Sequence, residues 1–113
     1  MANLEAFLES ENLDLECMHN IDANINMTVP WYLMAAYAYY VEDNPILSDN
    51  FFDKLANKML DRWNEIEHYH KHYITEDDLR AGTFLGEYPI RVEGGLKSLK
   101  EIYYGKNSTR KHR

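Results

Sequence analysis

The sequence predicts a mostly α-helical protein: a small bundle of four or five helices, with one short strand or extended segment near residues 87–92. Three observations predict this fold class. Apolar residues recur at helical spacing from Asp49 onward, an uncharged apolar stretch covers residues 31–41, and helix-start and helix-stop signals flank the periodic segments. The length of 113 residues and the 45% apolar fraction fit one domain with a modest core.

The first part of the chain predicts two helices. Asn3 is placed to cap a short helix near the start, and residues 11–27 show no clear periodicity and therefore predict an irregular connection. Thr28 and Pro30 offer a second helix start, because proline is tolerated in the first turn. The segment 31–41 carries no charge and predicts a helix buried among its neighbours.

The strongest amphipathic pattern starts after Ser48, which is a plausible N-cap. The pattern predicts a helix from Asp49 to about residue 70. Its apolar positions at helical spacing are Phe52, Leu55, Met59, Trp63 and Ile66.

The last part of the chain predicts two shorter helices. Thr75 and Asp78 form a capping-box pattern, and Gly82 is a natural helix stop. Residues 87–92 ("EYPIRV") predict a short strand or an extended segment, and residues 96–104 predict a last helix after two glycines. We therefore expect one helical domain over residues 1–105.

The net charge of −7 is unevenly distributed. Residues 106–113 ("KNSTRKHR") hold four of the twelve basic residues and no acid, which predicts a basic, flexible tail. The other 105 residues hold 8 basic and 19 acidic groups, a net of −11. An acidic body repels phosphate backbones, so we expect nucleic-acid association only weakly and only through the tail.

Other compositional features point to a cytoplasmic protein. Cys17 is the only cysteine, which excludes an internal disulfide framework and fits a reducing compartment. The start of the chain lacks the basic region of a signal peptide, and no apolar run has the length of a membrane span, so we expect no membrane partner.

Aromatic residues and carboxylates gather in the stretch "YYVEDNPILSDNFFDKL", residues 39–55. Asp49 and Asp53 are four residues apart and share one helix face, where like charges repel by a few tenths of a kcal/mol. A bound cation would relieve this repulsion, and aromatic faces suit a cationic ring. In the alternative interpretation, Asp49 only stabilises the helix start, Asp53 is a solvated rim residue and the aromatics belong to the core.

The same stretch resembles the N-terminal helical domain of NAD-dependent DNA ligases. In that family a tyrosine-histidine pair ends one helix, an Asp-x-Pro turn follows, and an Asp-x-x-Tyr-Asp run opens the next helix. The resemblance covers residues 31–82, and Tyr40 and Phe52 stand where the family has histidine and tyrosine. It implies a nicotinamide nucleotide site, for NMN or NAD and without a metal, at Tyr39, Tyr40, Asp49, Phe52 and Asp53.

The resemblance also implies a role. The sequence contains no K-x-D-G motif, which carries the lysine nucleophile of the ligases, so we expect a non-catalytic domain. A free-standing domain of this kind suggests a compact genome such as that of a bacteriophage, which would place the protein in the host cytoplasm or in the virion. It would bind the nucleotide or act as an accessory to a ligase-like partner. The alternative is a structural or adaptor protein that makes protein contacts, or forms a homo-oligomer, without a ligand.

The segment "EHYHKHY" offers a weaker candidate site. His68 and His72 are i and i+4 if the segment is helical, a spacing that can hold a metal ion. No second pair of ligands is evident in the sequence, so we expect no metal site.

Overall fold

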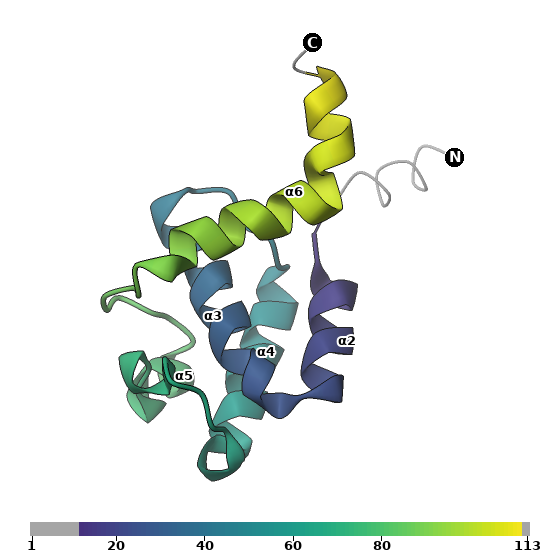
Figure 1. Ribbon diagram of the computed structural model, residues 1–113. Coiled ribbons are helices and arrows are strands. Elements are labelled where there is room, and N and C mark those ends of the chain that lie inside the picture. Colours follow the sequence, from purple (N-terminus) through teal and green to yellow (C-terminus); the bar gives the residue numbers. More distant parts are fainter. Residues whose placement is uncertain (1–11, 112–113) are drawn as a thin grey trace.

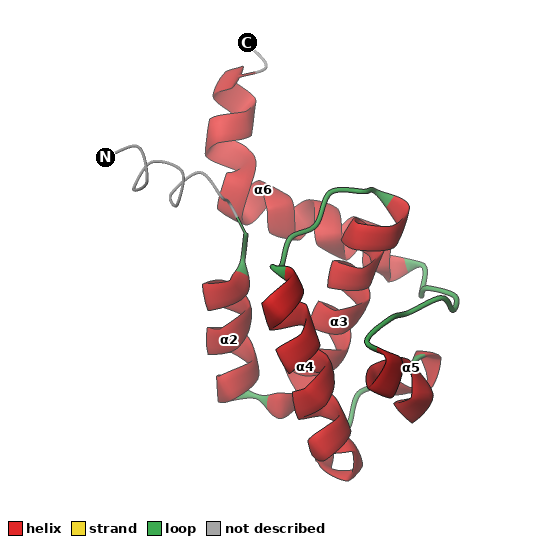
Figure 2. Ribbon diagram, turned by 180° about the vertical axis from the view of Figure 1, so that it is seen from behind, coloured by secondary structure: helices red, strands yellow, loops and turns green. Residues whose placement is uncertain are grey.

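The computed structural model describes the backbone of residues 12–111 and the side chains of residues 12–104. Five α-helices and no strand occur within the described residues, which confirms the predicted helical bundle (Figures 1 and 2). The helix predicted after Asn3 lies outside the described residues. No described helix is long and apolar enough to cross a bilayer.

The central helix is α3, Thr28–Ala36, and it begins at the predicted residue. In Figure 1, α4 (Asp49–Asp61) runs beside α3, α2 (Asp14–Ala23) lies on one flank and α5 (Glu76–Ala81) on the other, while α6 (Arg91–Lys111) lies across the end of the bundle.

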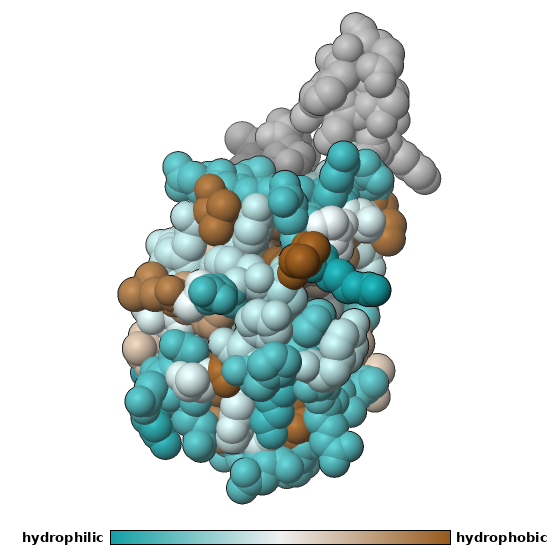
Figure 3. All heavy atoms as spheres, turned by 60° about the vertical axis from the view of Figure 1, so that its left-hand side comes forward, coloured by the Kyte–Doolittle hydropathy of each residue, from teal (hydrophilic) through white to brown (hydrophobic). Residues whose placement is uncertain are grey.

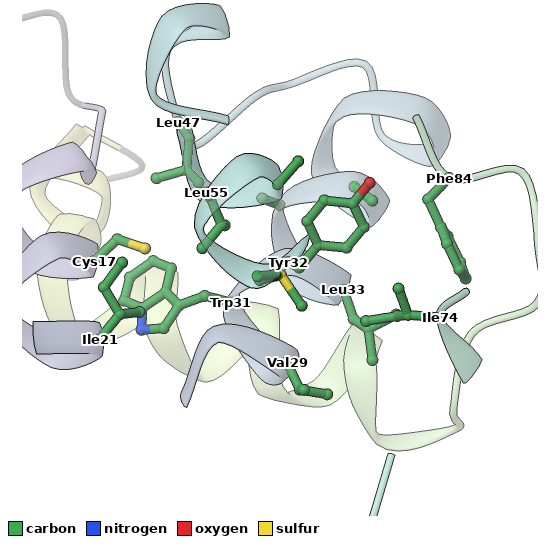
Figure 4. Packing of buried hydrophobic residues seen from close by; sticks show 14 of the residues in the cluster. Cys17, Ile21, Val29, Trp31, Tyr32, Leu33, Leu47, Leu55, Ile74 and Phe84 are labelled. Carbon is green, nitrogen blue, oxygen red and sulfur yellow. The ribbon is translucent and has the colours of Figure 1, made fainter. Parts of the chain in front are cut away.

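The side chains of α3 form the centre of the core, because they pack toward the helices on both sides of it. Figure 4 shows Trp31 turned toward Cys17 and Ile21 of α2, and Leu33 turned toward Ile74 on the opposite side. These five side chains are all buried. The prediction of a buried helix over residues 31–41 is confirmed for the part within α3. It is wrong for the end of the segment, where a π-helical turn follows and Tyr39, Tyr40 and Val41 are exposed.

The structure corrects the expectation of an irregular connection over residues 11–27, because α2 occupies Asp14–Ala23. Only a narrow stripe of this helix is buried: Leu13 just before it, then Cys17 and Ile21. These residues are spaced by four, which is helical spacing, but the other faces are mostly polar and also carry the exposed apolar residues Leu15 and Met18, which blurs the pattern.

The predicted long helix is also shorter than expected. It ends at Asp61, and 3₁₀ turns follow at Trp63–Glu65 and Lys71–Tyr73. Lys71 explains this ending: its Nζ donates to the carbonyls of Trp63 (2.7 Å) and Ile66 (2.9 Å) and lies 4.6 Å from the Trp63 ring centre. Ile66 still reaches the core, although it is no longer helical.

The last helix begins earlier than predicted. It starts at Arg91 rather than after the glycine pair, and no strand forms over residues 87–92. Gly95 lies within the helix, where a Cβ atom would meet Met34 Sδ of α3 at 3.6 Å. This is an ordinary van der Waals distance, so an alanine would also fit here, and the glycine only weakens the helix. The helix continues to Lys111, into the segment predicted as a tail.

Candidate functional site: an aromatic and acidic pocket

The five predicted site residues lie around one pocket of the described structure. Its cavity volume is about 240 Å³. The lining residues are Ala35, Tyr39, Tyr40, Pro45, Leu47, Asp49, Phe52, Asp53 and Gly82. The pocket is therefore built from the end of α3, the π-helical turn and the connection that follow it, the first turns of α4 and the residue that ends α5.

The first turns of α4 supply one wall. Ser48 is the N-cap, as predicted, and its Oγ accepts a hydrogen bond from Phe51 N at 3.1 Å. The helix that starts there places Asp49, Phe52 and Asp53 on one face, because residues three and four apart are neighbours on a helix.

Asp14 of α2 fixes this helix start from outside. Its carboxylate accepts hydrogen bonds from Ser48 N (2.9 Å, to Oδ1) and from Ser48 Oγ (2.6 Å, to Oδ2). Leu13 N also donates to the Ile46 carbonyl at 2.6 Å. The two segments are therefore joined at this point, and the sequence showed no signal for this contact over 34 residues.

A π-helical turn, η2 (Tyr37–Val41), supplies the aromatic wall. The Tyr39 and Tyr40 rings meet nearly at a right angle (87°) with centroids 4.8 Å apart, and the two residues are 46% and 38% exposed. We name this pair the aromatic corner. A π-helical turn is rare, and it is found frequently at functional sites.

The chain leaves this turn through a left-handed residue. Asp43 has a φ of 52°, the only positive φ of a non-glycine residue within the described chain. The Glu42 amide bonds to the Tyr37 carbonyl (3.1 Å), and the Asn44 amide reaches back to the Ala38 carbonyl (2.8 Å). These two hydrogen bonds end the π-helical segment and direct the chain toward Pro45, which lines the pocket.

Phe52 is held from behind by the core. One face of its ring stacks on Tyr32, with centroids 4.9 Å apart and planes 15° from parallel. Tyr32 is buried, and its hydroxyl donates to the Thr83 carbonyl at 2.8 Å. The position of the Phe52 ring thus depends on α3 and on the chain after α5.

Gly82 closes the opposite side of the pocket. Thr75 and Asp78 form both bonds of the predicted capping box at the start of α5, and Gly82 ends the helix with a φ of 70°. A Cβ atom at Gly82 would lie 3.4 Å from Asp53 Oδ1. The sequence predicted Gly82 only as a helix stop, whereas the structure also places it in the pocket lining.

Aromatic packing continues behind the corner. Tyr88 lies against Tyr37 and Phe84, with ring centroids 5.1 Å and 5.0 Å away. Its buried hydroxyl has no hydrogen-bond partner within the described structure. Burial, with the nearby Tyr40 and Tyr37, raises the pKa of Tyr88 to about 12. Burial and then Tyr39 raise the pKa of Tyr40, against the lowering effect of a hydrogen bond with the Phe84 backbone.

A second, more polar cavity of about 300 Å³ adjoins the pocket and shares Asp53 and Gly82 with it. Its lining includes Asn57 and Arg80. The Arg80 guanidinium is already paired with the carboxylates of Asp77 (3.0 Å) and Glu76 (3.9 Å).

The histidines of residues 68–72 do not lie on an α-helix, which is the arrangement that an i, i+4 metal pair would need. His68 and His72 are not on an α-helix, since residues 69–70 form a turn and residues 71–73 a 3₁₀ turn. His68 stacks on Tyr69, and its Nδ1 accepts a hydrogen bond from His70 N at 3.0 Å. The described part of the chain holds no group of three or more metal-ligating residues.

The fold and the pocket define a small α-helical domain with an aromatic and acidic ligand-sized pocket. No family model, no curated protein and no solved structure matches the chain. The resemblance to the ligase domain therefore stays a prediction, and any function is argued from the pocket.

Proposed function

We propose that this protein binds a nicotinamide nucleotide, NMN or NAD, with the nicotinamide ring in the pocket. One observation carries the proposal: the five residues predicted from a linear motif come from two separate helical elements and line one cavity.

The chemistry of the lining supports this ligand class. The oxidised nicotinamide ring is a planar cation, and the aromatic corner together with Phe52 offers flat faces for it. Asp49 and Asp53 provide the compensating negative charge. The cavity of about 240 Å³ is smaller than the range of roughly 300–1,000 Å³ of pockets for drug-sized ligands, so it accommodates one ring and leaves the rest of a nucleotide outside.

We further propose that the protein binds rather than transforms its ligand. The K-x-D-G motif is absent from the sequence. A separate ligase-like protein would then supply the nucleophile, and this domain would orient or retain the nicotinamide half of the nucleotide.

An adaptor function is the second candidate, and one observation favours it. Leu85, Ile90 and Ile102 are apolar and strongly exposed, with exposed fractions of 83%, 97% and 70%. Exposed apolar residues that cluster mark interaction surfaces, whereas single ones are ordinary. On the face shown in Figure 3, the apolar side chains are scattered among polar ones, which gives less support to this candidate than the pocket gives to the first.

Isothermal titration with NMN and NAD tests the proposal. We expect saturable binding that is lost in the double variant Asp49→Asn, Asp53→Asn. The matched control is Asp61→Asn, Glu101→Gln, which removes the same charge at two exposed positions outside the pocket. The absence of heat at millimolar nucleotide, or equal losses in both double variants, would argue against a nicotinamide site here.

A further inference from the structure

The charges around the pocket are of one sign. Among the described residues, Asp49 and Asp53 are the only charged ones that line it, and no described lysine, arginine or histidine does. The adjoining cavity adds one cation, Arg80, which is already paired with Asp77 and Glu76. The immediate surroundings therefore attract cations and offer no unengaged positive charge to a phosphate group.

The shape of the aromatic lining favours a flat cation. The two rings of the aromatic corner stand at 87° to each other, so a ring that stacks on one of them directs its edge at the other. Phe52 packs one ring face on Tyr32, and it also lines the pocket. Three aromatic side chains and two carboxylates thus surround a space of about 240 Å³.

We propose, on the basis of the nicotinamide site proposed above, that the pocket recognises a planar organic cation through its quaternary ring nitrogen, and that a phosphate group adds nothing to the affinity. The ligand class is an N-alkylated pyridinium without a phosphate, such as nicotinamide riboside. This narrows the ligand from the nucleotides named above to the corresponding nucleoside.

Two matched pairs of small molecules test this assignment with the full chain. The first pair is nicotinamide and nicotinamide methylated on its ring nitrogen, which differ by one methyl group and one positive charge. The second pair is nicotinamide riboside and NMN, which differ by the phosphate. Ligand-observed NMR titration measures all four affinities, and tetramethylammonium serves as a cation without a ring.

We expect the methylated cation to bind about 5–30-fold more tightly than neutral nicotinamide, because a cation–π contact in a partly desolvated site is worth about 1–2 kcal/mol and each 1.4 kcal/mol is a factor of ten. Nicotinamide riboside should bind at least as tightly as NMN. Tetramethylammonium should bind more weakly than the methylated ring. The Asp49→Asn, Asp53→Asn variant should lose the preference for the cation, with its thermal melt recorded to show that it is folded.

The outcomes separate this inference from the proposed function. If NMN binds more tightly than the riboside, beyond the error of the titration, the phosphate is recognised and the inference is overturned, while the nicotinamide site stands. Equal binding of nicotinamide and its methylated cation would overturn the role of charge, and equal binding of tetramethylammonium would overturn the planar ring. If none of these ligands binds to the folded protein, both proposals fail.

Discussion

Replacing Asp14 by alanine should destabilise the protein by removing the contact that holds the start of α4. The carboxylate accepts two hydrogen bonds from Ser48, at 2.9 Å and 2.6 Å, in a partly buried position. Hydrogen bonds to charged groups contribute about 1.5–3 kcal/mol, and the Ser48 amide would lose its partner. For a chain of this length, the usual unfolding entropy converts this loss into a decrease of about 6–12 °C in Tm.

Differential scanning calorimetry of the wild type and three variants measures this effect. The control is Asp22→Ala on the same helix, which removes an exposed ion pair with Lys58 (3.6 Å) and should cost less than about 1 kcal/mol. Asp14→Asn should lie between the wild type and Asp14→Ala, because an amide oxygen can still accept one bond. If Asp14→Ala lowers Tm no more than Asp22→Ala does, the contact does not fix α4 as argued.

Three further predictions concern the pocket and the titratable groups. Gly82→Ala should cost about 1–2 kcal/mol because of its positive φ, and it should weaken ligand binding by crowding Asp53, as thermal melts and titrations will show. Burial and neighbouring positive charge lower the pKa of His68 and His70 below 6.5, so these side chains take up protons more readily in the unfolded state than in the folded one. The free energy of unfolding should therefore decrease as the pH decreases from about 7 to 5, and it should decrease less in a variant with glutamine at both positions. Tyr88→Phe should leave the denaturant midpoint unchanged or higher, since it removes a buried hydroxyl without a partner, and a clear decrease would reveal a missing bond.

The sequence predicted the elements in which local signals agree. The start of α3, the Ser48 cap, the capping box of α5 and the stop at Gly82 all appear where the residues indicated. Each of these features depends on hydrogen bonds or backbone angles within a few residues. They are therefore visible in a short window of sequence.

The errors occurred where distant contacts decide the structure. The helix of α2 depends on a narrow buried stripe, and α4 ends early because the Lys71 amine satisfies two carbonyls beyond it. Gly95 lies inside α6, although glycine ordinarily favours a helix end. No periodic pattern contains these contacts.

The candidate site could be predicted in part, because most of its residues are close together in the sequence. The five predicted residues lie within 15 positions of one another, so their spacing indicates a shared space. The π-helical turn that presents the aromatic corner could not be predicted, because it changes the helical period over five residues. Gly82 and Leu47 also line the pocket, but Gly82 comes from a distant segment and Leu47 shows only the apolar character of a core residue.

The two walls of the pocket are fastened to the rest of the protein by separate contacts. The acidic wall is held through Asp14, whereas the segment after the aromatic corner is held by α6, where Lys100 Nζ lies 2.8 Å from Glu42 Oε1. The Phe52–Tyr32 stack joins the two walls, whereas Tyr39 and Tyr40 lie outside that stack. Such a site can evolve a new ligand preference by exchanging Tyr39 and Tyr40 while its carboxylates, and the fold that carries them, are retained.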